Sequence, residues 1–149
     1  DMKFGSEVAE LSYKARQVKK IAGELDVPII CVTQLNRQVE LRDNKIPQMA
    51  DLRGSGEFEQ SADQIILLYR EKYYSQTGNG SNKKENSTEE KDNDKELNLA
   101  EGWQIVELNV AKNRAGEPGK TYLLFNPALS RFDTPSLETL KVIESCKKS

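Results

Sequence analysis

The chain has 149 residues and a formal net charge of −2, with 22 Lys and Arg against 24 Asp and Glu. This length suits one domain, and the nearly balanced charge excludes a strongly basic nucleic-acid-binding chain, so any basic surface must be local. The chain has no histidine and its two cysteines are far apart, which argues against a zinc site and against a His-based catalytic triad.

The first predicted element is an amphipathic helix over Ser6–Leu25, with Ser6 as its N-cap, because apolar residues recur at three- and four-residue steps. The helix is expected to end at Asp26, since Pro28 disfavours helical geometry at Val27. The nearly all-apolar run Ile29–Thr33 then predicts a strand that is buried on both faces of a parallel sheet.

Further along, the pattern predicts a short helix, a second buried strand, an insertion, a hairpin and a terminal helix. Low apolar content predicts that residues 75–102 form a disordered surface insertion within the single domain. Alternating apolar residues predict the two hairpin strands. In chain order the other elements are a helix at Glu57–Ser61, strands at Gln64–Tyr69, Trp103–Val110 and Thr121–Phe125, and a helix at Pro135–Cys146.

Together these elements predict an α/β fold with parallel strands first and an antiparallel hairpin at the sheet's edge. A sheet buried on both faces usually has more parallel strands than the two expected here, which suggests additional sequence upstream. No apolar run approaches the roughly 20 residues needed to span a bilayer, and the N-terminus has no signal-peptide pattern. We therefore expect a soluble, cytoplasmic protein.

Three polar blocks carry the chemistry. The first is Thr33–Arg37, where Gln34 follows the predicted strand. Ligands of α/β sheets bind at the carboxyl ends of parallel strands, and an amide there can sense a terminal phosphate or position a water molecule. On these five residues alone, a glutamine that only caps a loop is the competing interpretation.

The second block is Asp51–Gly56, in which Gly54 and Gly56 flank a serine. The two glycines allow a tight turn whose N–H groups can bind an anion, and Arg53 adds a bidentate phosphate contact. Such contacts go to a nucleic-acid backbone and carry no sequence information. An ordinary turn before a helix is the alternative.

The third block is Lys112 to Arg114, at the end of the first hairpin strand. Two cations one residue apart on a strand point to the same side, and a hairpin can present them to a neighbouring molecule. An arginine supplied in this way stabilises the charge that develops in phosphoryl transfer. The alternative is a solvated hairpin tip.

In this order and spacing, the three blocks resemble the C-terminal ATPase domain of the DnaB-type replicative DNA helicases, over about Ser6 to Asp133. The resemblance implies that residues 1–149 are the C-terminal half of a RecA-like P-loop NTPase domain. It departs from the family at Gly54, where an acidic residue is common, and in the length of the 75–102 insertion.

The resemblance also implies roles and partners. Gln34 would be the phosphate sensor in cis, and Lys112 and Arg114 the fingers that reach ATP on the adjacent subunit. Arg53, with the backbone of Gly54 and Gly56, would hold single-stranded DNA. The complete enzyme would use ATP and Mg²⁺, form a ring, expected to be a hexamer, and work with primase and a helicase loader.

No G-x-x-x-x-G-K-[ST] phosphate loop occurs in the chain. In the family that loop, the catalytic glutamate and the metal-binding aspartate lie upstream of the segment that matches here. We therefore expect no ATPase activity from this polypeptide alone. Two alternatives remain: a non-catalytic helicase-like module that binds a full-length subunit or DNA, and a recombinase or clock-type ATPase relative, which the D-L-R-x-S-G loop argues against.

Overall fold

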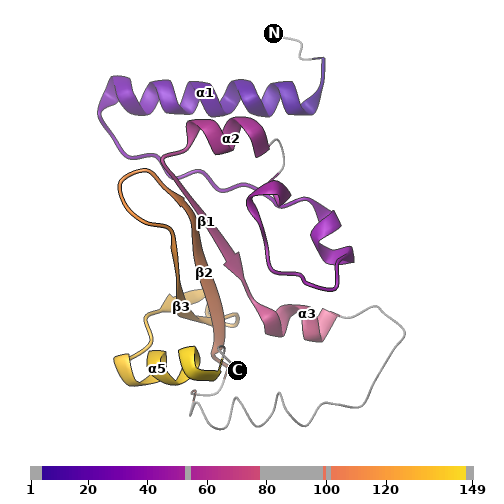
Figure 1. The fold of residues 1–149 in the computed structure, drawn as a ribbon, viewed down its shortest axis with the longest axis vertical. Helices are drawn as coiled ribbons and strands as arrows, with labels where there is room; N and C mark the ends of the chain where they lie inside the picture. The colour runs from indigo at the N-terminus through magenta and orange to yellow at the C-terminus, as the bar shows by residue number, and fades with distance from the viewer. Residues whose placement is uncertain (1–4, 53–54, 78–98, 100–101, 147–149) are drawn as a thin grey trace. The chain divides into compact units, whose positions relative to one another are not determined.

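The computed structural model describes residues 5–52, 55–77, 99 and 102–146 (Figure 1). The chain divides into two units, and each is described by itself. Unit 1 contains Asp1–Leu67 and Asn109–Gly119, and unit 2 contains Leu68–Leu108 and Lys120–Ser149. In both units the described helices are too short or too polar to cross a membrane.

Helix α1 spans Glu7–Leu25 in unit 1. Ser6 begins it as predicted, because its hydroxyl accepts a hydrogen bond from the Ala9 amide at 3.2 Å. Asp26 ends it in a left-handed conformation with φ of 51°. Ala15 is buried, whereas Ile21 and Leu25 remain exposed, so only part of the apolar stripe is covered in this chain.

The prediction of a buried strand at Ile29–Thr33 is wrong for the described chain. The segment has no regular secondary structure, and Ile30 and Val32 are 92% and 97% exposed. A strand in a sheet needs hydrogen bonds to a neighbouring strand, and the sheet described below is made of other segments of the chain. The apolar sequence is that of a buried strand, but no described segment covers it.

Two short 3₁₀ helices follow, η1 at Arg37–Leu41 and η2 at Met49–Asp51. Both lie in a loop between Leu35 and Leu52. These two residues pair in an isolated antiparallel bridge, which closes the loop. The Asn36 amide also donates to the Asp51 carbonyl at 2.7 Å. The two ends of the loop are therefore joined side by side.

Helix α2 spans Ser55–Ser61 and strand β1 spans Gln64–Tyr69. The strand has the predicted bounds, but its burial alternates: Ile65 and Leu67 are buried, whereas Ile66 and Leu68 are about half exposed. Leu52, Ile65 and Leu67 form the core of unit 1. Leu35, Met49, Ala62 and Ala111 pack against it. One face of β1 thus carries the core that supports the loop before α2.

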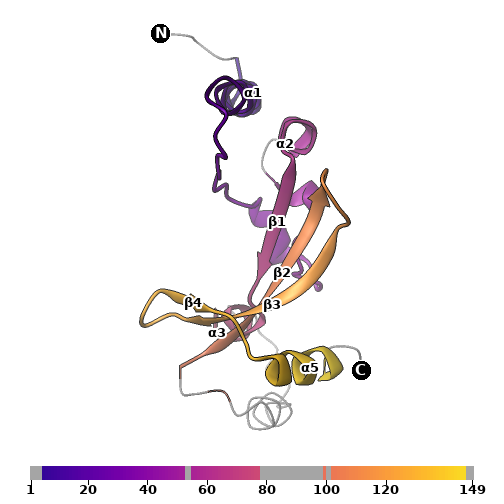
Figure 2. The ribbon, with the colours of Figure 1, turned by 90° about the vertical axis from the view of Figure 1, so that its left-hand side faces the viewer.

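The sheet has the order β1-β2-β3-β4 (Figure 2), with β2 at Gln104–Asn113, β3 at Gly119–Asn126 and β4 at Arg131–Asp133. The Arg114 amide, just after β2, donates to the Asp63 carbonyl, just before β1, at 2.9 Å. The end of β2 therefore lies beside the start of β1, so the two strands run in opposite directions. Strand β3 pairs with β4 antiparallel, with Phe125 opposite Phe132. The predicted hairpin strands are present and slightly longer than expected.

Unit 2 also holds helices α3 at Glu71–Thr77 and α5 at Leu137–Cys146. The sequence pattern did not predict α3, which includes three residues of the expected insertion. Its Tyr74 ring stacks on Tyr69, with centroids 5.8 Å apart. Helix α5 was predicted, and Ile143 anchors it as a fully buried side chain. Most of the 75–102 insertion lies outside the described residues.

Candidate functional site

Gln34, the predicted phosphate sensor, lies in unit 1 directly before the Leu35–Leu52 bridge. Its side chain is exposed. It follows the irregular segment Ile29–Thr33 and does not end a regular strand, as the sequence had suggested. The backbone that follows Gln34 is nevertheless held in place, because Leu35 pairs with Leu52 and Asn36 hydrogen-bonds to Asp51, both before α2.

The segment that leads into the predicted DNA-binding loop is anchored by Asp51. This residue is buried, and its Oδ2 accepts hydrogen bonds from the Arg42 guanidinium at 2.7 Å and the Gln48 amide at 2.8 Å. Arg42 also donates to the Ile46 carbonyl at 3.2 Å. A charged pair with this many hydrogen bonds holds a loop without help from regular structure. These hydrogen bonds therefore hold the chain in place directly before Leu52 and the predicted DNA-binding loop.

Arg53 and Gly54, the first two predicted DNA-binding residues, lie outside the described residues. Gly56 lies inside the first turn of α2, whereas the sequence analysis placed the start of that helix after it. Gly56 is exposed, and a Cβ built on it would meet no heavy atom within 4 Å. Its surroundings are therefore open, which leaves room for an approaching backbone.

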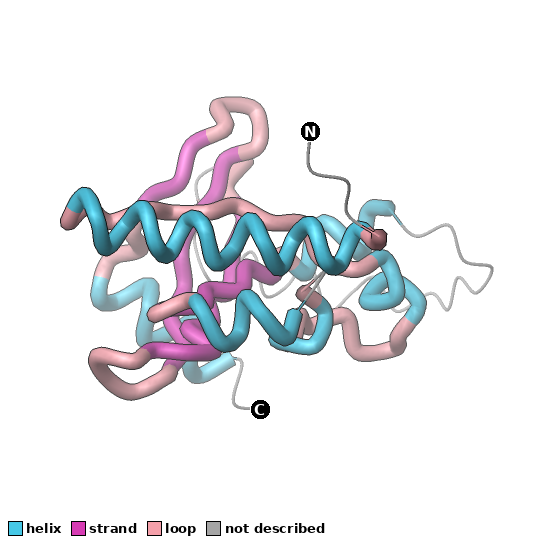
Figure 3. The backbone as a smooth tube through the Cα atoms, turned by 90° about the horizontal axis from the view of Figure 1, so that it is seen from above, coloured by secondary structure: helices cyan, strands magenta, loops and turns pink. Residues whose placement is uncertain are grey.

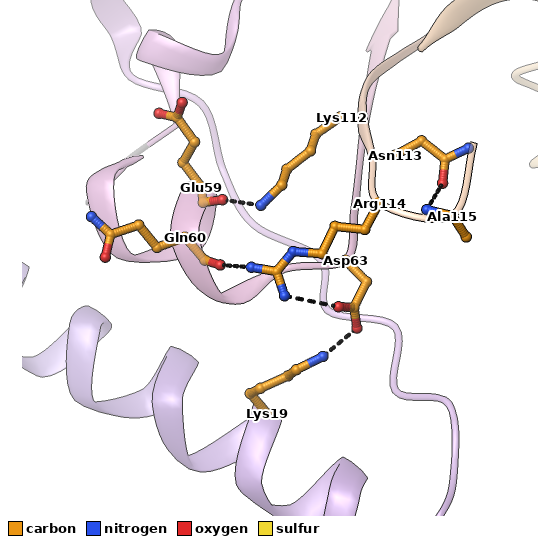
Figure 4. Close-up of polar contacts among 8 residues, drawn as sticks. All are labelled: Lys19, Glu59, Gln60, Asp63, Lys112, Asn113, Arg114 and Ala115. Carbon is orange, nitrogen blue, oxygen red and sulfur yellow. Dashed lines mark hydrogen bonds and ion pairs between the residues drawn. The ribbon is translucent and has the colours of Figure 1, made fainter. Parts of the chain in front are cut away.

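Lys112 and Arg114 both reach from the end of β2 to the C-terminal end of α2 (Figure 4). The Lys112 ammonium donates to the Glu59 carbonyl, and the Arg114 Nη2 donates to the Gln60 carbonyl at 2.5 Å. The prediction that the two cations point to the same side of the strand is confirmed. Within the described chain, these two contacts are with the last turn of their own subunit's helix α2.

The physical reason for this placement lies in the helix terminus. The last carbonyls of a helix have no intrahelical partners, and the aligned peptide dipoles give that end partial negative charge. Helix α2 ends at Ser61, so Glu59 and Gln60 belong to its last turn. Two cations close to these carbonyls satisfy acceptors that would otherwise depend on solvent.

Asp63 completes this arrangement. Its carboxylate pairs with Lys19 of α1 and with the Arg114 Nη1, the latter at 3.3 Å (Figure 4). The hydrogen bond from Lys19 is the main cause of a lowered pKa for Asp63. Partial desolvation opposes this effect, and the charges of Lys19, Arg114 and Lys112 add to it. Asp63 is thus held in its ionised form among three cations.

Helix α1 lies beside α2 in unit 1 (Figure 3). Two ion pairs connect them or their flanks: Arg16 with Glu57 at 3.0 Å, and Lys19 with Asp63. Glu57 also accepts a hydrogen bond from Ser61 at 3.0 Å. The end of α2 that receives Lys112 and Arg114 is thereby tied to the first helix of the chain.

The hairpin turn after β2 is fixed by Asn113. Its Oδ1 accepts hydrogen bonds from the Ala115 amide at 3.2 Å and from the Gln64 side chain at 3.1 Å. A Cβ on Gly116 would approach the side-chain nitrogen of Asn113 to 3.0 Å, so a larger residue here would require the Asn113 side chain to shift. The turn thus presents Arg114 from a defined backbone.

The described residues fit only part of a nucleotide site. Lys112 and Arg114 are suited to contact a phosphate, because cations near a terminal phosphate stabilise transferred charge. The run Gly119–Thr121 has the letters G-K-T, but it begins strand β3 and not a helix, and Lys120 pairs with Glu107 at 2.8 Å. Among the described residues, this G-K-T run is therefore not a phosphate-cradling loop.

The structure brings some predicted residues together and leaves others apart. It places the Gln34 segment beside the start of the DNA-binding block, and it places Lys112 beside Arg114. Among the described residues, no hydrogen bond or ion pair joins Gln34 to either cation. Sequence reasoning did not assign roles to Lys19, Arg42 or Asp63, because single charged residues carry no signal of their spatial partners.

Comparison with known proteins identifies the family of the chain. The family model for the DnaB-like helicase C-terminal domain matches residues 2–134. A replicative DNA helicase DnaB from Rickettsia bellii strain RML369-C is 36% identical over 134 residues, which are 87% of this chain and 26% of the relative. The chain thus spans about a quarter of the length of this curated relative.

Two solved structures share the fold. One, a structure of an ATPase domain, superposes with a TM-score of 0.68 at 35% identity, over 91% of this chain and 40% of that one. The other, a DnaB-like replicative helicase whose structure was described with its interactions with primase, gives a TM-score of 0.66 at 36% identity, over 89% and 27%. These neighbours confirm the predicted α/β, RecA-like class, and the chain belongs to the family of DnaB-like helicase C-terminal domains.

Proposed function

We propose that the chain works as part of an ATP-driven, hexameric replicative helicase that unwinds duplex DNA by translocating along single-stranded DNA. The bound ATP and Mg²⁺ of the complete enzyme would supply the phosphoryl group and its metal ion. Lys112 and Arg114 would contact the triphosphate held by the adjacent subunit, and Gln34 would sense the terminal phosphate in its own subunit. The cytoplasm is the expected compartment.

One observation carries this proposal: Lys112 and Arg114 are placed as a pair and retain capacity for a further ligand. A guanidinium has five N–H donors. The described contacts of Arg114's guanidinium use one donor to Asp63 and one to Gln60. Its side chain is also 52% exposed. An incoming phosphate therefore has both access and donors.

The second support is the connection between the sensor segment and the DNA-binding block. The Leu35–Leu52 bridge and the Asn36–Asp51 hydrogen bond tie the residue after Gln34 to the residue before Arg53. A phosphate-dependent movement of Gln34 would therefore reach the Arg53 loop over a short path. We propose that Arg53, with the Gly54 and Gly56 backbone, contacts the phosphates of the DNA strand.

Partners follow from the same assignment. Identical subunits in a ring are required if Lys112 and Arg114 act on a neighbour's nucleotide. One solved relative was described with its interactions with primase, and we propose primase and a helicase loader as partners of the complete enzyme. Single-stranded DNA is the proposed substrate track.

The trans assignment is tested by mixing two inactive variants of the complete subunit. One carries Arg114→Ala, and the other lacks the phosphate-loop lysine. If Arg114 acts in trans, mixed rings regain ATP hydrolysis, because an intact phosphate loop meets an intact Arg114 at some interfaces. If mixing restores no activity while rings still form, Arg114 does not act across the interface. Arg131→Ala, which removes a cation paired with Asp133, is the matched control.

The proposal also predicts that this polypeptide alone does not hydrolyse ATP. The measurement is phosphate release from the purified chain and from its Arg114→Ala variant. Turnover that survives purification and disappears in the variant would contradict the division of labour between adjacent subunits, because the activity would then lie within one chain.

A further inference from the structure

Asp63 contacts Arg114 in two independent ways. Its backbone carbonyl accepts the Arg114 amide at 2.9 Å, and its carboxylate accepts the Arg114 Nη1 at 3.3 Å. The residue stands between α2 and β1, so its backbone is held by two elements. Its carboxylate is held in turn by Lys19 (Figure 4).

These contacts restrict the guanidinium from opposite ends. Nη1 is bound to Asp63 and Nη2 to the Gln60 carbonyl, so the plane of the guanidinium is set by two acceptors on one segment. A guanidinium is planar, and two such bonds fix its rotation about the side chain. The remaining donors then face a defined direction.

We propose that Asp63 is a positioning residue for Arg114, oriented by Lys19, and that it sets the direction in which the guanidinium meets a neighbour's phosphate. This inference rests on the proposed role of Arg114 in phosphoryl transfer. Misplacing a catalytic group by about 1 Å can cost about 100-fold in rate. Asp63 itself touches no reacting atom.

The competing explanation is a surface ion pair with no role beyond folding. The Asp63 and Arg114 side chains are 58% and 52% exposed. Ion pairs this exposed contribute little to stability because water and salt screen them. The two explanations therefore separate in experiment: positioning predicts an effect on kcat, whereas a surface pair predicts almost no effect on either kcat or folding.

The test measures single-stranded-DNA-stimulated ATP hydrolysis by the complete subunit carrying Asp63→Asn, Asp63→Glu, Arg114→Ala, or both Asp63→Asn and Arg114→Ala. We expect Asp63→Asn to lower kcat at least about tenfold with KM nearly unchanged, and Asp63→Glu to restore part of the loss. The double variant should be no slower than Arg114→Ala, because a residue that acts only through Arg114 loses nothing further.

Lys19 provides a second route to the same carboxylate. Lys19→Met should also lower kcat, but by less than Asp63→Asn does. Lys20→Met is its matched control on the same helix, since Lys20 pairs with Glu24 at 3.6 Å and is not among the cations that lower the pKa of Asp63. Asp133→Asn controls for loss of an exposed aspartate in an ion pair.

A direct readout uses the full chain and no activity. The ¹⁵N–Hη signals of Arg114 should be resolved in the wild type, because Nη1 and Nη2 are each held by an acceptor, and should average in Asp63→Asn but not in Asp133→Asn. Unchanged dispersion elsewhere in the spectrum shows that folding is intact.

The outcomes separate the two claims. If Arg114→Ala leaves kcat unchanged, the proposed function fails, and the positioning role fails with it. If Arg114→Ala abolishes turnover while Asp63→Asn and Lys19→Met match the wild type, only the positioning role is overturned. Arg114 side-chain signals that are the same in Asp63→Asn as in the wild type also overturn it, because Asp63 would then not hold the guanidinium.

Discussion

Leu35 and Leu52 face each other in an antiparallel bridge that joins the chain after Gln34 to the chain before Arg53. Leu52 is buried with Ile65 and Leu67, and Leu35 packs against that cluster. The contact between these two blocks, whose functional roles we propose, is therefore made in the hydrophobic core of unit 1. Stability and communication between the blocks should depend on the same residues.

Leu52→Ala should lower the free energy of unfolding by about 2–5 kcal/mol, the usual cost of a leucine-to-alanine cavity in a core. Leu52 is only 7% exposed, whereas Leu41 is 86% exposed and provides the control. Urea unfolding of both variants measures the difference. Equal midpoints for Leu52→Ala and Leu41→Ala would contradict the described core.

Asp51→Ala should cost about 1.5–3 kcal/mol, because it removes the charged acceptor of the Arg42 and Gln48 hydrogen bonds. Asp43→Ala, at an exposed aspartate of the same loop, is the matched control. Unfolding gives the stability, and hydrogen exchange at the Gln48 amide gives the local effect. Slow exchange at Gln48 in Asp51→Ala would be inconsistent with the anchor.

The pH dependence of Asp63 follows from its lowered pKa. A carboxyl whose pKa is lower in the folded state stabilises the fold at pH above its unfolded value. That contribution is lost as the pH falls through the folded-state pKa. Lys19→Met removes the largest cause of the shift, so the pKa of Asp63 should rise toward its ordinary value. Carboxyl chemical shifts followed by NMR during acid titration measure this.

Lys20→Met should leave the Asp63 titration unchanged, because Lys20 pairs with Glu24. An equal rise in both variants would mean that the helix's total charge, and not the Lys19 hydrogen bond, controls the carboxyl.

Self-association should follow from the exposed apolar run. Ile30 and Val32 are almost fully exposed, and such side chains promote association between copies. Sedimentation velocity of the chain should show association that increases with concentration and falls in a variant with Ile30→Ser and Val32→Ser. Leu41→Ser with Leu129→Ser changes two other exposed residues and is the control. Equal association of both variants would place the contact elsewhere.

Local signals in the sequence predicted much of the fold. The Ser6 cap, the Gln64–Tyr69 strand and the hairpin depend on neighbouring residues, and the structure has all three. The strand predicted at Ile29–Thr33 depends on partners far from it, and composition cannot show whether those partners are present. Helix α3 was missed because its tyrosines and polar residues have no clear apolar period.

The site divides in the same way. The spacing of Lys112 and Arg114 predicted that both point to the same side, and their contacts with the last turn of α2 confirm it, although Arg114 lies just after β2. The sequence could not predict that these two side chains contact the end of α2 and Asp63, because those partners are far from them in the chain. The roles of Gln34, Arg53, Gly54 and Gly56 remain predictions.

The central claim is that this chain carries a helicase's DNA-binding loop, and fluorescence anisotropy with labelled single-stranded DNA across a salt series tests it most directly. We predict binding that weakens as salt rises, because phosphate contacts release counterions, and that drops further in Arg53→Ala but not in Arg131→Ala. The assay is made on the chain alone and again with the complete subunit. Binding of the complete subunit that is unchanged by Arg53→Ala at every salt concentration would contradict the claim.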